Sequence, residues 1–403
     1  NIRKSNIINT FQSLKNHNFR LLVLGMISMI GGMNVQMLAR SQLGWDLTSS
    51  SLAVTMVGIG FAPPMLLFSF FGGVVSDRFD NKQIIQVGQF GVICITTFIA
   101  ISIFTNTITI YHLITVSLFQ GTFWAFMMPA RQAIISELVP ESQLNNAVAL
   151  NAAGMSLTTM ISPAIGGLIY HFFGPGYTYI LITLFCIVAV ICTSMLPSLK
   201  KSPKESRNLS KEISQVISLV KNNSILGYVL SLVLFTTLLS MPTRTLFAPY
   251  SSEVINGGPL QVGLMLASIG GGALMGTLIV ASLGQNIKKG KLILMTSVLS
   301  GSSILFLGFS HLTILSIVLC FFLGLGDAGR RSLSPSMIME KTPIEFRGRI
   351  MGIYAMSFGF IPLGALPLGY IADYLGVDSA FITAGIALII ITLIFNRKSV
   401  RES

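Results

Sequence analysis

The sequence predicts an all-α membrane protein whose twelve transmembrane helices form two pseudo-symmetric six-helix bundles. Three observations predict this fold class: an apolar composition, the regular return of long apolar segments, and a repeat between the two halves. Of the 403 residues, 52% are hydrophobic and 10% are charged, and the mean hydropathy is +0.76. A soluble domain of this length needs a larger charged surface, so little of the chain is expected to face water.

Apolar segments recur twelve times between Phe19 and Phe395. Crossing the hydrocarbon core of a bilayer takes about 20 helical residues, and each segment reaches about that length. The expected spans, numbered 1 to 12 in chain order, lie near residues 19–41, 52–76, 83–104, 109–138, 144–172, 177–196, 223–250, 259–284, 291–309, 312–340, 347–373 and 377–396.

Basic residues gather on one side of this topology. Of the 26 Lys and Arg residues, 21 lie in six segments that share one side of the membrane, and the opposite loops contain none. These segments are 1–20, 77–82, 197–222, 285–291, 341–349 and 397–403. The positive-inside rule therefore predicts a multi-pass protein of the bacterial cytoplasmic membrane with both termini in the cytoplasm. The net charge of +12 therefore reflects the orientation of the protein in the membrane and not nucleic-acid binding. Anionic lipid headgroups on the cytoplasmic side reinforce this orientation.

The two halves of the chain resemble each other at an offset of 203 residues. The matching pairs are Gly121 with Gly324, Ala125 with Ala328, Glu137 with Glu340, Pro140 with Pro343, and Gly166 with Gly369. An internal duplication predicts such matches, and parallel six-helix repeats are typical of transporters. We therefore expect an N-terminal bundle over 1–196, a cytoplasmic linker over 197–222 and a C-terminal bundle over 223–403.

The linker changes character along its length. Its first part contains two prolines and several basic residues, whereas apolar residues recur at helical spacing from Leu209 to Val220. This second part is expected to form either an amphipathic helix on the membrane surface or a helical extension packed on span 7.

A charged turn follows span 2 on the cytoplasmic side. Its glycine, acid and bases are Gly73, Asp77, Arg78 and Lys82. Such a turn suits a latch whose ion pairs and helix-end contacts break and reform. It resembles the signature loop between helices 2 and 3 of the major facilitator superfamily, although Asp80 stands where that family usually has glycine. The resemblance implies that Asp77 contacts the start of helix 11, near Arg347, and steadies the outward-open state.

Spans 5 and 8 both carry small residues. Span 5 contains Ser162, Pro163, Gly166 and Gly167, which resemble the proline-glycine motif of the superfamily's antiporters with serine in place of one glycine. Span 8 contains Gly270, Gly271, Gly272 and Gly276. Small residues let helix backbones approach closely, and proline introduces a bend. Since helices 5 and 8 face each other in the resembling fold, these residues are expected at a gate. Close packing without movement is the alternative.

Longer sequence runs make the resemblance specific to one branch of the superfamily. The runs Pro129–Pro140 and Phe346–Arg349 are similar to the enterobactin-exporter and macrolide-efflux branch of the superfamily, and the similarity spans nearly the whole chain. It implies efflux of a medium-sized organic molecule. Many drug antiporters also carry an arginine three residues before a Gln-Gly pair in helix 4. Here Ser117 precedes Gln120 and Gly121, so that family's proton-coupling arginine has no counterpart at this position.

Five basic residues remain inside the spans: Arg40, Arg131, Arg244, Arg330 and Arg331. An arginine at the centre of a bilayer costs about 2.5 to 3.5 kcal/mol on insertion scales, so these side chains are expected to face protein or a watery cavity. They lie on spans 1, 4, 7 and 10, the helices that line the cavity in the resembling fold. Arg131 lies toward the inner end of span 4, where it either lines the cavity or has a structural role, by snorkelling to the membrane surface or by pairing with Asp77 or Glu137.

Asp327 is the deep acid of the chain, about 15 residues into span 10 and so close to the membrane midplane at 1.5 Å per residue. It is expected to be a protonatable coupling group. The alternative is an ion pair with Arg331, four residues later on the same helix face. The polar residues expected to share the cavity are Asn34, Gln36, Gln120 and Trp124.

These observations favour a secondary active transporter that exports a small amphipathic, anionic, siderophore-like molecule by proton-coupled alternating access. Multidrug efflux, for example of macrolides, is the alternative, and lipid or lysolipid transport is a further one. No catalytic constellation lies at membrane depth, so an enzyme is not expected. The cysteines, Cys94, Cys186, Cys192 and Cys320, all lie inside apolar spans and are interpreted as packing residues without a metal or cofactor. The expected partners are the substrate, protons and membrane lipids, and the protein is expected to be a monomer.

Overall fold

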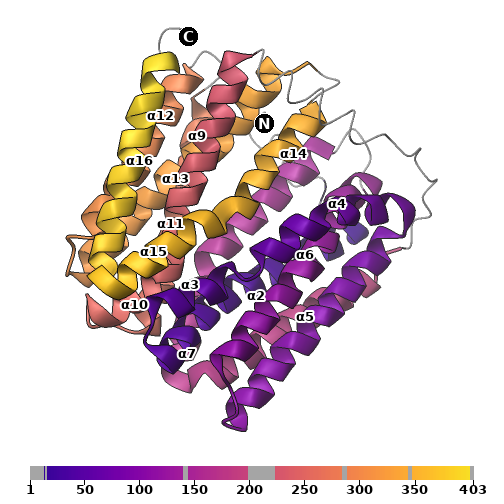
Figure 1. Ribbon diagram of the computed structural model, residues 1–403. Coiled ribbons are helices and arrows are strands. Elements are labelled where there is room, and N and C mark those ends of the chain that lie inside the picture. Colours follow the sequence, from indigo (N-terminus) through magenta and orange to yellow (C-terminus); the bar gives the residue numbers. More distant parts are fainter. Residues whose placement is uncertain are drawn as a thin grey trace, which may run out of the picture. The chain divides into compact units, whose positions relative to one another are not determined.

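The computed structural model describes residues 13, 16–138, 144–197, 223–283, 288–343 and 347–399. Every regular element in these ranges is a helix (Figure 1), so the predicted all-α class is confirmed. The linker lies outside the described residues except for Pro197.

Ten helices in the described ranges are long and apolar enough to cross a membrane. Two differences separate this number from the expected twelve. Helix α7 (Leu144–Ser194) joins spans 5 and 6, and its non-helical residue Gly174, followed by Pro175, marks the junction. Span 11 is broken into α14 (Arg347–Met356), the 3-10 turn η5 (Ser357–Phe360) and α15 (Ile361–Leu375). Dividing α7 and counting the broken segment as one span restores the predicted pattern.

The contacts within the chain divide it into two compact units. Unit 1 comprises residues 1–40 and 63–205, and unit 2 comprises 41–62 and 206–403. Predicted span 2 (52–76) therefore does not fall wholly into one unit, because residues 41–62 cluster with the C-terminal residues. The bundle limits expected from the sequence, with a boundary only at the linker, stay a prediction.

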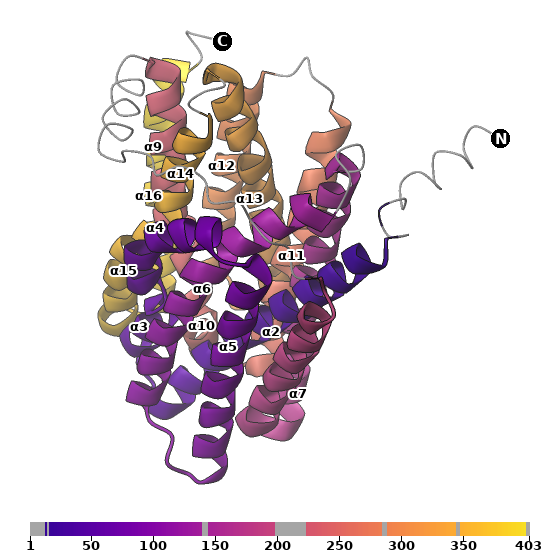
Figure 2. The ribbon, with the colours of Figure 1, turned by 90° about the vertical axis from the view of Figure 1, so that its right-hand side faces the viewer.

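Unit 1 is built from the first part of α2 (His17–Thr48), with α4 (Ala62–Arg78), α5 (Asn81–Phe104), α6 (Ile110–Leu138) and α7. Helix α5 packs against α6 and α7, and Figure 2 shows the hairpin that α5 and α6 form. Asp80 caps the start of α5, because its carboxylate accepts a hydrogen bond from the Lys82 amide at 2.9 Å. The core near the start of α2 includes Phe19, Ile85 and Ile134.

Unit 2 contains the end of α2, α3 (Ser51–Ile59), α9 (Ser224–Ser240), the 3-10 turn η3 (Pro242–Leu246), α10 (Phe247–Glu253), α11 (Pro259–Ser282), α12 (Lys289–Leu307), α13 (Thr313–Lys341), α14, η5, α15 and α16 (Val377–Ser399). Helix α13 packs against α11 and α12, while α16 packs against α12, α9 and α15. The core of unit 2 includes Leu232, Ile293 and Ile350. Helix α13 thus lies among its neighbours, where a polar side chain is shielded from lipid.

The same junction recurs in the two halves. Gly174 lies within α7 between expected spans 5 and 6, and Gly376 separates α15 from α16. Both have positive φ, 82° and 90°, a region that favours glycine because it lacks a Cβ. The two glycines are one residue away from the offset predicted for the repeat, which agrees with an internal duplication.

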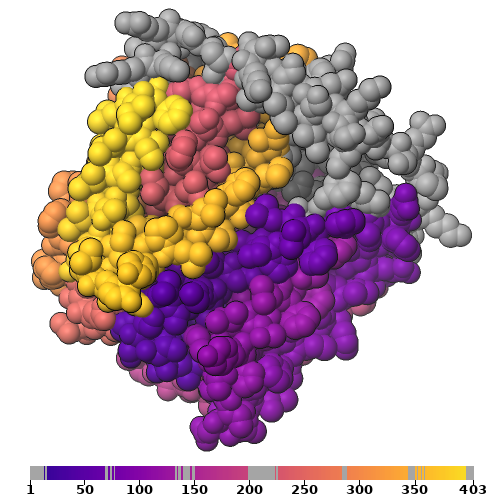
Figure 3. Space-filling model, viewed as in Figure 1, coloured from indigo at the N-terminus to yellow at the C-terminus, as the bar shows by residue number. Residues whose placement is uncertain are grey.

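Large apolar side chains cover the outer surfaces of the helices. Leu67 is 68% exposed in unit 1, and Ile314 and Ile394 are 79% and 62% exposed in unit 2. The face of unit 2 in Figure 3 is formed largely by α15 and α16, drawn in orange and yellow. Such a surface is unfavourable in water and suits contact with lipid, as expected for a multi-pass membrane protein.

Candidate substrate and coupling site

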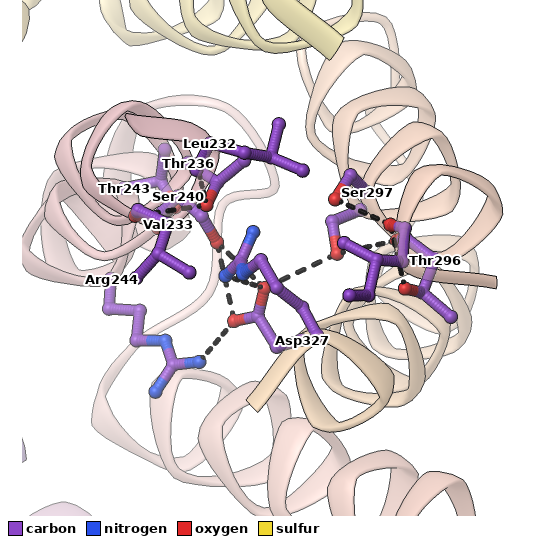
Figure 4. Close-up of polar contacts among 12 residues, drawn as sticks. Leu232, Val233, Thr236, Ser240, Thr243, Arg244, Thr296, Ser297 and Asp327 are labelled. Atoms are coloured by element: carbon purple, nitrogen blue, oxygen red, sulfur yellow. Dashed lines mark hydrogen bonds and ion pairs between the residues drawn. The ribbon is translucent and has the colours of Figure 1, made fainter. Parts of the chain in front are cut away.

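Asp327 on α13 is fully buried in unit 2 and is surrounded by hydrogen-bond donors (Figure 4). Its Oδ2 accepts a hydrogen bond from Nη2 of Arg244 at 2.7 Å, and its Oδ1 accepts one from Nη2 of Arg330 at 2.8 Å. Ser240 Oγ lies 3.0 and 3.2 Å from the two carboxylate oxygens, and Ser300 Oγ lies 3.2 Å from Oδ1. Two charged and two neutral donors therefore hold one carboxylate, and they come from α9, η3, α12 and α13.

Local sequence explains how these helices reach one point. Helix α9 ends at Ser240, and Pro242 opens η3, where its missing N–H interrupts the α-helical hydrogen bonds. The resulting turn brings Arg244 to the same carboxylate as Ser240. On the other side, a Cβ added at Gly326 would lie 2.9 Å from the backbone nitrogen of Ser300, so only glycine permits this approach of α12 and α13.

The cluster carries more positive than negative charge. Two arginines meet one acid, and each arginine keeps a buried nitrogen without a hydrogen-bond partner: Nε of Arg244 and Nη1 of Arg330. The Arg244 side chain is 14% exposed, whereas that of Asp327 is 0% exposed. Unpaired buried donors are costly, so a further acceptor at this point would be favourable.

Arg331, which follows Asp327 by four residues on α13, is not its ion-pair partner. It is exposed, and the ion pairs described for Asp327 are with Arg244 and with Arg330, three residues along α13. The alternative that Asp327 and Arg331 simply satisfy each other is therefore wrong. A neighbour from another helix, not visible from spacing on α13, supplies the second cation.

Unit 1 also buries an arginine, but with neutral partners. Nη1 of Arg40 donates to Ser117 Oγ at 3.0 Å and to Gln120 Oε1 at 2.9 Å. Gln120 in turn donates to Gln36 Oε1 at 2.7 Å. These residues join α2 to α6, so the structure brings together three of the polar positions expected to share a cavity. The ion pairs described in the chain include none with Arg40.

Arg131 and Trp124 lie together on α6. The guanidinium carbon of Arg131 is 5.7 Å from the centre of the Trp124 ring, a cation–π distance. Both side chains are buried, and the Trp124 Nε1 has no hydrogen-bond partner. Asn34 is separate from this pair and reaches Thr159 at 3.4 Å. Glu137 and Asp77, the acids expected near Arg131, have side chains outside the described set.

The expected cytoplasmic latch is only partly visible. The backbone of Gly73 and Asp77 is helical in α4, and Arg78 is the exposed last residue of that helix. Lys82 Nζ donates to the carbonyl of Ser194 at 2.8 Å and to that of Leu196, so it satisfies acceptors at the end of α7. Arg347 begins α14, and its side chain lies outside the described set. The Asp77 contact with helix 11 stays a prediction.

The small residues make close contacts inside their own units. A Cβ at Gly166 would lie 2.9 Å from Val35 of α2, and Pro163 and Gly167 are buried. On α11, a Cβ at Gly276 would lie 2.7 Å from the Leu325 carbonyl oxygen of α13. Gly271 faces elsewhere and lines a shallow apolar depression of about 450 Å³ with Leu274, Met275 and Leu278. These contacts fit close packing, and the gate role stays a prediction.

Sequence reasoning missed Ser240 and Ser300. Ser240 stands four residues before Arg244, a spacing that places both on one side of a helix, and this signal was available. Ser300 has no such signal, because serine is common in apolar helices and its approach to Asp327 depends on Gly326.

Comparison with known proteins now decides the family. The model of the transmembrane secretion effector family of the major facilitator superfamily matches residues 8–403. The chain belongs to this family. It is therefore a transporter of the major facilitator superfamily and not an enzyme, as the sequence predicted.

Curated relatives of the transporter are named for the transport of different molecules. It is 23% identical to macrolide efflux protein A of Streptococcus pyogenes, over 86% of this chain and 87% of the relative. It is 25% identical to the staphyloferrin A transporter of Staphylococcus aureus, over 83% and 85%. It is 25% identical to the enterobactin exporter EntS of Escherichia coli, over 92% and 87%.

Solved structures support the fold of the transporter. A POT family transporter in complex with 5-aminolevulinic acid matches with a TM-score of 0.73 and 14% identity, covering 94% of this chain and 96% of that chain. The peptide transporter POT in complex with sulfate matches with a TM-score of 0.74 and 12% identity, covering 95% and 94%. At this identity the match shows the fold alone.

Proposed function

We propose that this transporter exports a small amphipathic anion, siderophore-like in its acidic groups, by proton-coupled alternating access. The observation that supports it is the Asp327 cluster, in which two buried arginines share one acid and keep two unpaired N–H donors. A substrate carboxylate would satisfy those donors with charge-assisted hydrogen bonds, which are roughly twice as strong as neutral ones. A relative named as a staphyloferrin A transporter and another named as an enterobactin exporter agree with this substrate class.

The substrate proposal is tested by binding to purified protein at constant salt. The ligands are a polycarboxylate siderophore, a catecholate siderophore, a macrolide and a cationic dye. Arg244→Gln should weaken the acidic ligands about tenfold and leave the dye unchanged, because Arg244 is the more exposed arginine of the cluster. Arg331→Gln is the comparison and should weaken the acidic ligands less, since Arg331 lies in the same unit but outside the ion pairs of Asp327. If the dye or the macrolide binds best to wild type and its affinity is the same in both variants, multidrug efflux replaces the proposal.

Lipid transport is separated by a different assay. Reconstituted protein is tested for movement of a fluorescent lysolipid between leaflets of liposomes, with Arg244→Gln as the comparison. Lysolipid movement that exceeds protein-free liposomes and needs Arg244 would favour a lipid substrate. Movement at the protein-free rate would favour the soluble anion.

Proton coupling is assigned to Asp327, the buried carboxylate of the cluster. In inverted vesicles, Asp327→Asn should abolish uptake driven by a pH gradient and still permit exchange of labelled for unlabelled substrate, because asparagine keeps a neutral side chain of the same shape. Gradient dependence equal to wild type would reduce Asp327 to an ion-pair partner.

The orientation with both termini in the cytoplasm is part of the proposal. Ser49 and Asn256 lie at helix boundaries with positive φ and are expected on the outer side. In a background lacking the native cysteines, Ser49→Cys or Asn256→Cys should react with an impermeant thiol reagent in intact cells, and Ser202→Cys should not. Labelling at Ser202 alone would reverse the orientation.

A further inference from the structure

The start of α3 is held by an acid from a distant part of the chain. Ser50 is the N-cap of α3, and its hydroxyl accepts a hydrogen bond from the Ala53 amide at 3.1 Å. The same hydroxyl donates to Oδ2 of Asp373 at 2.7 Å, and the Ser51 amide donates to Oδ1 of Asp373. Asp373 lies near the end of α15, so both of its carboxylate oxygens bind the first turn of another helix within unit 2.

Helix dipoles make this contact favourable in one arrangement only. An acid near the carboxyl end of its own helix is repelled by that end, where the carbonyl groups carry partial negative charge. The amino end of α3 offers the opposite partial charge and a free N–H group. Asp373 therefore gains more from α3 than from α15, and it loses that gain whenever the two helices separate.

The helices approach closely just before the acid. A Cβ at Gly369, one turn before Asp373, would lie 2.8 Å from Oγ1 of Thr55 on α3. Ser41 at the end of α2 donates to the carbonyl of Thr245 at 2.9 Å, which attaches the same segment to η3. Residues 41–62 are thus joined to α15 and η3 by an ion-dipole contact, a glycine contact and a hydrogen bond.

This attachment divides one predicted span. The sequence predicts span 2 over 52–76, yet its first part, α3, clusters with unit 2 and its second part, α4, with unit 1. In the predicted topology the start of span 2 and the end of span 11 both lie on the outer side. Opening the outer side by alternating access therefore requires that α3 and α15 separate or that the chain bends between α3 and α4.

We propose that Asp373 is an outer latch that holds α3 to α15 and releases it each time the transporter opens outward. It is the counterpart of the inner latch predicted at Asp77, because helix 11 would then be held by its start in one state and by its end in the other. The proposal rests on alternating access but not on any substrate.

The test measures how often buried Thr55 becomes accessible. Thr55→Cys is placed in a background whose four native cysteines are serine, and intact cells are treated with an impermeant maleimide. Asp373→Asn should raise the labelling rate about fivefold, the effect of losing one helix-capping partner. Glu340→Gln is the matched control, because Glu340 is an exposed acid of unit 2 near the end of α13, where it pairs with Lys289 and not with α3 or α15. Equal labelling rates in the two variants would overturn the latch.

Two further measurements cover the case in which Asp373→Asn does not fold. Ser50→Ala keeps the carboxylate and removes one hydrogen bond, so it should raise labelling about twofold. Spin labels at exposed Leu47 and Tyr374 report the separation directly by double electron-electron resonance. A longer distance population in Ser50→Ala supports the latch, and distributions identical to those of the parent contradict it. Neither readout needs a substrate, so failure of the anion proposal leaves this test intact.

Discussion

Unit 1 and unit 2 each bury an arginine on a helix expected to line the cavity, but they satisfy it in opposite ways. Arg40 in unit 1 binds the neutral side chains Ser117 and Gln120. Arg330 in unit 2 binds the carboxylate of Asp327, which a second arginine also holds. Neutral partners hold a cation without changing its charge environment, whereas protonation of an acid changes the charge of the whole cluster. The difference makes unit 2 the half that is suited to respond to protons.

The largest expected effect comes from removing the shared acid. Asp327→Ala leaves two buried arginines without their carboxylate, and breaking a buried ion pair costs about 3–5 kcal/mol. The thermal unfolding temperature of the purified protein in detergent measures the loss. The double variant Asp327→Ala with Arg330→Gln removes one charge of each sign and should recover part of the loss. No recovery would mean that charge balance is not what stabilises this cluster.

Removing a single arginine should cost less, because the remaining one still balances Asp327. Arg330→Gln is expected to destabilise the protein by about 1–3 kcal/mol. Arg244→Gln should cost less than Arg330→Gln, since its side chain is 14% exposed and that of Arg330 is 4% exposed. The exposed Arg331→Gln provides the baseline, within about 0.5 kcal/mol of wild type. The reverse order of the two buried arginines would contradict the burial argument.

In unit 1 the corresponding change should be milder. Arg40→Gln removes a buried cation whose partners are neutral, so no opposite charge is left behind. We expect a loss of about 1 kcal/mol, the value of an ordinary hydrogen bond, measured in the same unfolding experiment. A loss as large as that of Asp327→Ala would erase the contrast between the units.

The smallest effects are expected from the hydroxyl groups that bind the buried charges. Ser300→Ala and Ser117→Ala each remove one of several hydrogen-bond partners of a charged group, and each should cost about 0.5 kcal/mol, the low end for one hydrogen bond. Ser300 should also affect the pH at which gradient-driven uptake is half-maximal, because its hydroxyl binds the ionised form of Asp327. Ser117→Ala should leave that pH unchanged. A shift with both variants would show that the two clusters are coupled.

The fold was largely predictable because membrane insertion depends on composition and length. Residue types along the chain are enough to identify the apolar segments, their charged borders and the repeat between the halves. The family match confirms the class that these features predict. The break of span 11 at Ser357–Phe360 was not predicted, although Pro362 follows it closely and lacks the N–H that would continue the α-helical hydrogen bonds. Helix limits of this kind depend on packing against neighbours, which hydropathy does not record.

Within the site, residue types alone indicate which ionisable groups lie in apolar spans, although they did not indicate that Arg331 is exposed. Placing Asp327 and the arginines in apolar spans obliges them to find polar partners, because lipid offers none. Which partners they find depends on how the helices pack. Arg330 and Arg244 rather than Arg331 pair with Asp327, and Ser50 meets Asp373, because distances between helices depend on the glycines, prolines and turns that orient each backbone. Spacing along one helix specifies a face, and the packing of several helices specifies what that face meets.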